Sequence, residues 1–231
     1  MAEFYQNFLA PTKAVYSMWI ICAAIVIFAF LSTRKLKEVP GPLQNIAEMA
    51  VGALQNFFSG ILGLERTRRF FPVLATFFIF IIVCNYTSQI PGAGEFFTVP
   101  TSVLAVTLAL AVISAFAIHT FGFKTHGFVP YLKTFLKPVA LMLPITLLEQ
   151  VVRPFSMALR LYGNIYGEEQ VSHTLFELFP LLLPLVMQVL GLLFGFIQAM
   201  IFTMLLAVFI DEATELEEEE GKPHNALPAK H

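Results

Sequence analysis

The chain has 231 residues, of which 57% are hydrophobic and 13% are charged, with a formal net charge of −2. Soluble domains carry about 25% charged residues, so this composition argues against a soluble domain and against nucleic-acid binding, which needs a basic face. The 25 phenylalanines exclude intrinsic disorder, and the predicted class is an all-α membrane protein that spans the bilayer several times.

Charge-free stretches predict the membrane helices in chain order. About 20 apolar residues are needed to cross the hydrocarbon core. We expect one integral membrane domain over residues 1–231. It begins with a short segment at 1–13 and ends with an acidic tail at 211–231. About five transmembrane helices are predicted within it, over residues 14–33, 70–94, 96–123, 138–169 and 174–210.

Two regions depart from simple perpendicular spans. Residues 41–65 have apolar positions at helical spacing with polar interruptions, which predicts an interfacial or re-entrant helix. Leu178 to Ile210 is a stretch of 33 residues without a charge. Because this exceeds a perpendicular span, we expect the last two helices to be long and tilted or near-horizontal.

The basic residues predict the orientation of the chain. They gather in Arg34, Lys35 and Lys37, in Arg66, Arg68 and Arg69, and in Lys124, Lys133 and Lys137. Loops rich in lysine and arginine face the cytoplasm. The turn at residues 91–100 has neither residue and is expected outside, which places the N-terminus outside and the C-terminus in the cytoplasm.

Ionisable residues inside a membrane helix are costly and indicate function. Arg160, Asn164 and Glu168 are spaced four apart, so on an α-helix they line one face. Gln198 is one of two strongly polar side chains in the last apolar stretch. Arg160 could instead form a static ion pair with Glu168 or Glu149, and the amides could serve only as hydrogen bonds between helices.

Other polar residues carry weaker signals. His119 lies in an apolar stretch and fits a packed neutral histidine, whereas His126 and His173 lie near charge boundaries. Cys22 and Cys84 both fall in apolar stretches, which indicates small buried side chains rather than a disulfide. No metal and no cofactor are expected.

Three blocks of sequence resemble one family. RPFSMALRLYGNIYGEE (153–169) is similar to the signature of subunit a of F-type ATP synthases, with Tyr162 in place of phenylalanine in an LRLFGN-like core. IQAMIFTMLLAVFI (197–210) resembles the family's final helix, with its glutamine at Gln198. NYTSQIPG followed by PTSVLAVTLALA resembles the family's Pro-Gly turn and the membrane helix after it.

The resemblance implies a stator subunit of the membrane sector, CF(0), with two offset half-channels beside a ring of c subunits. Arg160 would face the ring carboxylates and separate the half-channels, Glu168 would serve the outer one and Glu149 the inner one. Asn164 and Gln198 would line the path. Further implied partners are the peripheral-stalk b subunits and the rest of the complex in a bacterial plasma membrane, with protons as the expected ion and sodium as the alternative.

The chain departs from the family where outer acids are common, because it has Val103, Ala105 and Gly191 there. The outer path would then depend on Glu168, water and either His119 or His173. The subunit is expected to be non-catalytic, since no phosphate-binding Gly-rich loop is present. The alternative functions are an independent secondary transporter, which usually shows internal repeats, and an intramembrane protease, whose motifs are absent.

Overall fold

The computed structural model describes residues 11–34, 37, 40–89, 98–127, 131, 143–178 and 182–221. Within these residues the secondary structure is helical throughout, which confirms the all-α prediction. The elements are α2 (Pro11–Thr33), α3 (Pro42–Leu62), α4 (Leu64–Thr87), the 3-10 turn η1 (Pro100–Ser102), α6 (Leu104–His126), α8 (Leu143–Leu178) and α9 (Leu182–Gly221). The first ten residues and the last ten lie outside this description.

In the described part of the chain, four helices are long and apolar enough to cross a membrane. The spans lie in α2, α4, α6 and α9, at Lys13–Thr33, Leu64–Thr87, Leu104–His126 and Val186–Thr214. α8 is not among them, because charged residues such as Glu149, Arg153 and Arg160 recur along it. This is the segment in which the sequence predicts a polar site within an apolar setting.

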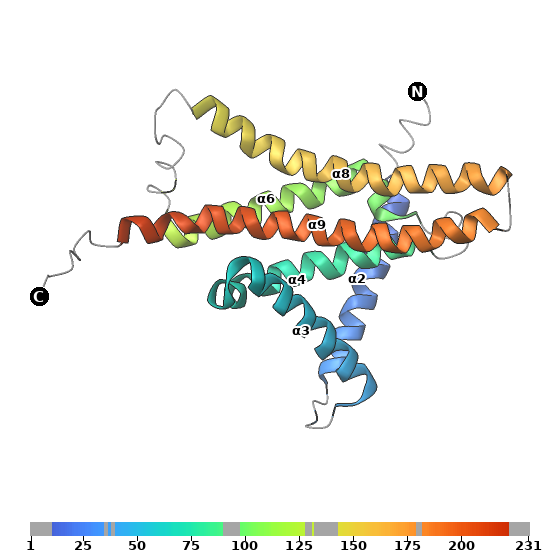
Figure 1. Ribbon diagram of the computed structural model, residues 1–231, viewed down its shortest axis with the longest axis horizontal. Coiled ribbons are helices and arrows are strands. Elements are labelled where there is room, and N and C mark those ends of the chain that lie inside the picture. The colour runs from blue at the N-terminus through green and yellow to red at the C-terminus, as the bar shows by residue number, and fades with distance from the viewer. Residues whose placement is uncertain are drawn as a thin grey trace, which may run out of the picture.

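The two longest helices form an antiparallel pair along the long axis of the molecule (Figure 1). α8 has 36 residues and α9 has 40, which correspond to about 54 Å and about 60 Å of helix. Both exceed the hydrocarbon core of about 30 Å, so neither fits as a perpendicular span. α8 continues to Leu178 and α9 begins at Leu182, so the pair turns later than the boundary predicted between residues 169 and 174.

The helix predicted over residues 41–65 is α3, which packs against α4, α9 and α2. It begins with Pro42 at its first helical position, where the missing N–H costs nothing. It ends at Gly63, whose φ of 78° lets the chain pass at once into α4. Leu54 and Phe58 bury its inner face.

α9 is the central helix of the core. Figure 1 shows it between α8 on one side and α4 on the other, with α6 crossing it, and it packs against all three. Phe202 and Leu206 of α9, Phe70 and Leu74 of α4 and Leu161 of α8 are all 1% exposed or less. Burial of this kind fixes the position of α9 relative to both neighbours.

Polar contacts define two ends of this helix bundle. At the basic end, where α4 begins and α9 ends, Arg66 forms an ion pair of 2.7 Å with Asp211. At the opposite end, called here the Gln89 end, Gln89 follows α4 and contacts Glu168 of α8. α4 is therefore antiparallel to α9 and parallel to α8. The basic residues at the start of α4, which are predicted to face the cytoplasm, lie at the basic end.

Candidate functional site

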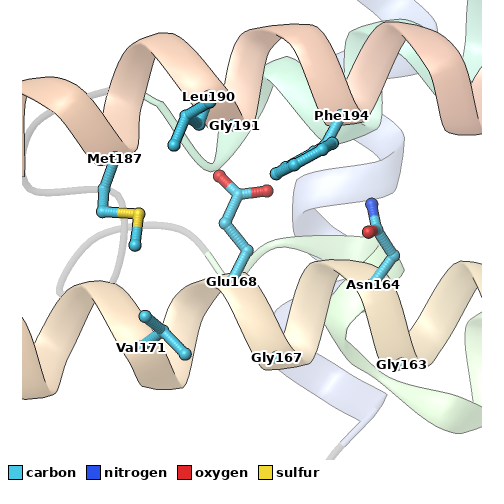
Figure 2. A pocket seen from close by; sticks show the side chains of 9 residues that line it. All are labelled: Gly163, Asn164, Gly167, Glu168, Val171, Met187, Leu190, Gly191 and Phe194. Atoms are coloured by element: carbon cyan, nitrogen blue, oxygen red, sulfur yellow. The ribbon is translucent and has the colours of Figure 1, made fainter.

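A carboxylate from α8 reaches across to α9 near the Gln89 end. Figure 2 shows the Glu168 side chain pointing from α8 toward Gly191 of α9, with Asn164 one turn away on the same side of α8. The side chains border a cavity of about 250 Å³. It is lined by Gly163, Asn164, Gly167, Glu168, Val171, Met187, Leu190, Gly191 and Phe194.

Only one oxygen of the Glu168 carboxylate accepts a hydrogen bond from a described residue. Gln89 donates a hydrogen bond of 2.5 Å from Nε2 to Glu168 Oε1. Glu168 Oε2 is buried and has no hydrogen-bond partner in the described part of the chain. A buried carboxylate oxygen without a partner is costly unless it binds water or a proton. The geometry therefore suits a group that exchanges a proton at Oε2.

Asn164 presents a second unsatisfied group beside the same cavity. Its Nδ2 is buried without a hydrogen-bond partner among the described residues. Glu168 thus offers an acceptor and Asn164 a donor, one helical turn apart, toward one apolar-walled space. Polar groups arranged in this way are those that bound water normally bridges.

Two glycines of α9 admit polar side chains from α4 and from the residues that follow it. Asn85 Nδ2 donates a hydrogen bond of 3.0 Å to the carbonyl oxygen of Gly195. Gln89, just after α4, approaches Gly191, where a Cβ atom would overlap both the Gln89 amide and the Glu168 carboxylate. Gly191 therefore forms an opening in α9, called here the glycine window, through which Gln89 reaches α8.

We expect Gly191→Ala to lower the free energy of unfolding by about 2 kcal/mol, the cost of losing a hydrogen bond to a charged group. The new methyl group would lie 2.7 Å from Glu168 Cδ, so the flexible carboxylate and amide must leave the window. The measurement is thermal unfolding of the protein in detergent micelles. Gly167→Ala is the matched control, because nothing lies within 4 Å of its added atom. Equal stability of both variants would contradict the role of the window.

Arg160 lies outside this cavity, on the surface of α8. Its side chain is exposed and makes no hydrogen bond or ion pair with any described residue. Static pairing with Glu168 or Glu149 is therefore absent here. Its neighbours Leu159 and Phe155 are 42% and 49% exposed, so the charge lies at an apolar surface.

The antiparallel register brings Gln198 to the level of Arg160. Glu168 lies beside Gly191, and Arg153 lies over the Phe209 ring at 5.0 Å. Moving eight residues back along α8 from Glu168 reaches Arg160, and moving seven forward along α9 from Gly191 reaches Gln198. The Gln198 side chain is 6% exposed, so its amide is buried between helices rather than facing outward.

Glu149 lies at the basic end, far along α8 from the cavity. Its carboxylate is 3.5 Å from Arg153, which also forms a two-point ion pair with Glu212 at 2.6 and 3.2 Å. Glu149 is more exposed than Arg153. This cluster joins α8 to the end of α9, and it leaves the Glu149 carboxylate accessible from the basic end.

The histidines lie apart from Glu168. His119 Nδ1 is 3.1 Å from the hydroxyl of Tyr131, and His126 Nε2 is 3.2 Å from the carbonyl oxygen of Ala213. Both contacts lie toward the basic end, so the structure brings neither His119 nor His126 to the cavity. His173 belongs to α8, and its side chain lies outside the described atoms.

Sequence reasoning missed Gln89 as a member of the site. NYTSQIPG was interpreted as a turn, and the contact with Glu168 spans 79 positions. No periodic pattern joins residues on α4 to residues on α8. A polar residue two positions before a Pro-Gly pair was the available signal.

The fold and the site define a class: an all-α membrane protein with ionisable residues on two long antiparallel helices. Residues 15–211 match the family described as ATP synthase A chain. The chain is 38% identical to "ATP synthase subunit a 3" of Pelobacter propionicus, covering 92% of this chain and 95% of that protein. It is 40% identical to "ATP synthase subunit a 1" of Syntrophotalea carbinolica, covering 85% and 83%.

Identity is 38% to "ATP synthase subunit a" of Moorella thermoacetica, over 86% of this chain and 88% of that one. The chain therefore belongs to the ATP synthase A chain family. Membership assigns it to the membrane sector of ATP synthase, CF(0), and to ion transport in a bacterial membrane.

Proposed function

We propose that this chain is the ion-conducting stator subunit, passing protons through two offset half-channels to and from the carboxylates of a ring of c subunits. Arg160 faces the ring and separates the half-channels. The observation that carries the proposal is an arginine with no partner among the described residues, on an exposed apolar surface of α8. The chain itself performs no ATP chemistry, which belongs to other subunits.

The surface around Arg160 suits a partner inside the membrane. On α8, Val152, Phe155 and Leu159 are 49%, 49% and 42% exposed at helical spacing. Apolar side chains alone are compatible with lipid, but a charged arginine among them is costly in a bilayer. A passing carboxylate on an apolar helix satisfies both requirements.

The fixed positive charge of Arg160 would act directly on the ring carboxylates. It stabilises a nearby carboxylate in its ionised form, so the ring site must release its proton on arrival. Arginine keeps its charge in a protein, so the barrier between the half-channels is permanent. The membrane supplies about 2.3 kcal/mol per charge per 100 mV, which drives the ring in one direction.

The positions of these residues along α8 support a proposed place for each half-channel, one at each end of the helix bundle. The cavity with Asn164 and Glu168 is the outer half-channel, with His173 as a further candidate, and the accessible Glu149 is at the inner one. Gln198 lines the path at the level of Arg160. The basic end faces the cytoplasm by the positive-inside rule, with the N-terminus outside and the C-terminus inside. Peripheral-stalk b subunits are the expected neighbours.

Disulfide cross-linking tests the proposed ring surface. In a background of Cys22→Ala and Cys84→Ala, Leu159→Cys should cross-link to a cysteine placed on the outer helix of the c subunit, beside its carboxylate. The reason is that Leu159 is 42% exposed next to Arg160. The measurement is the yield of the cross-linked pair in membranes.

Ala158→Cys is the matched control, because the adjacent side chain is 0% exposed. It should give no product under the same oxidant. Equal yields at both positions, or none at position 159 in an assembled complex, would place the ring on another surface and contradict the proposal.

A further inference from the structure

The contact of Gln89 with Glu168 joins three helices at the glycine window. Gln89 follows α4, Glu168 belongs to α8, and Gly191 of α9 leaves the space between them. The space that a side chain at Gly191 would fill holds the Glu168 carboxylate and the Gln89 amide.

The orientation of the Gln89 amide is fixed by a second contact. Its Nε2 also donates to Ser88 Oγ at 3.2 Å, and Ser88 Oγ in turn donates to the carbonyl oxygen of Asn85 at 2.6 Å. The hydroxyl hydrogen of Ser88 is thus engaged, and the hydroxyl acts as an acceptor toward Gln89. The amide nitrogen, rather than the amide oxygen, is therefore directed at the carboxylate.

We propose that Gln89 is a positioning residue for proton transfer at Glu168, an inference that rests on the proposed function. By holding Oε1, it keeps the carboxylate in the glycine window and directs Oε2, which has no partner among the described residues, toward proton exchange. A carboxylate free to rotate would spend less time in this geometry, since each hydrogen bond to a charged group restricts its rotamers.

The proton transfer itself is balanced within the proposed path. A proton arriving from outer water forms an O–H bond at Glu168 Oε2, and the carboxylate becomes neutral. On departure that bond breaks, the electron pair stays on the oxygen, and the proton passes by way of the Asn164 side of the cavity to an ionised ring carboxylate. Gln89 neither gains nor loses a proton in either step.

The experiment compares variants in assembled ATP synthase in vesicles. Gln89→Met has similar length but no N–H, and we expect synthesis to fall by about tenfold per complex. Gln89→His keeps an N–H donor and should restore most of that loss. Gln188→Met is the matched control, because Gln188 is an exposed glutamine of α9 that does not line the cavity and should leave synthesis unchanged.

A double-variant cycle separates positioning from packing. Glu168→Asp draws the carboxylate back beyond the reach of Gln89, so adding Gln89→Met should then lower synthesis by less than about twofold. Equal losses by Gln89→Met in both backgrounds, or no rescue by Gln89→His, would overturn the inference in favour of a structural role. If Gln89→Met fails to assemble, Ser88→Ala, which frees the amide to turn, replaces it in the same cycle.

The failure of this inference is distinguishable from failure of the proposed function. Full synthesis in Gln89→Met, together with lost synthesis in Glu168→Gln, would remove only the role of Gln89. Full synthesis in both variants would remove Glu168 from the path, and the proposed outer half-channel with it.

Discussion

Arg160→Ala should reduce ion-driven ATP synthesis by at least about 100-fold, the usual scale for losing a charge that stabilises an ionised group at a reactive site. The ring carboxylate would no longer be held in its ionised form beside the stator, so it could pass between half-channels without releasing its proton. The measurement is ATP synthesis by vesicles under an imposed potential, with the amount of assembled complex determined on the same sample.

Assembly should survive this change, because the Arg160 side chain is exposed and holds no described neighbour in place. Arg68→Ala is the matched control, an exposed arginine at the basic end, and it should synthesise ATP normally. We also expect faster passive proton leak in Arg160→Ala. Near-normal synthesis with unchanged leak would show that Arg160 has no separating role, even though the family assignment would stand.

Glu168→Gln should lower ATP synthesis by about 100-fold, the scale for removing a positioned proton-transfer group. Glutamine keeps the size of the side chain and still fits the glycine window, but it cannot take up and release a proton at Oε2. Because the cavity walls are apolar apart from Asn164 and Glu168, no lining group among the described residues replaces it. The measurement is ATP-driven proton pumping and ATP synthesis on one preparation.

Glu65→Gln, an exposed acid at the basic end, controls for the loss of a charge. Glu169→Gln provides the sharper comparison, since Glu169 follows Glu168 directly but is exposed. We propose proton exchange at Glu168 and not at Glu169. If Glu169→Gln abolished transport while Glu168→Gln retained it, the exposed neighbour would be the exchanging group and the cavity would be structural.

Much of the fold was predictable because membrane helices consist of long apolar stretches without charged residues. The spans in α2, α4, α6 and α9 follow from charge-free stretches, and α3 follows from apolar spacing. The ends of helices were less predictable. Apolar residues continue from Leu178 to Leu182, so hydropathy alone contains no signal for where α8 stops and α9 begins.

The candidate site was also predictable only in part. The spacing of Asn164 and Glu168 predicts a shared face, and both line one cavity. The same spacing includes Arg160, which lies instead on the exposed surface, because one further turn beyond Asn164 carries it past the end of the cavity. Contacts between helices, such as Gln89 with Glu168, depend on the register of tertiary packing and have no local signature.

The two ends of α9 are secured by forces that respond differently to ionic strength. At the basic end, the partly exposed pairs Arg66–Asp211 and Arg153–Glu212 are open to screening by salt. At the other end, Asn85 packs on the Gly195 backbone and donates to its carbonyl oxygen, an arrangement of neutral groups that salt does not weaken. Raising the salt concentration therefore loosens only one end. Because Asn85 belongs to α4, the distance between α4 and α9 near the cavity should stay constant as salt rises, whereas the distance between α8 and α9 at the basic end should increase.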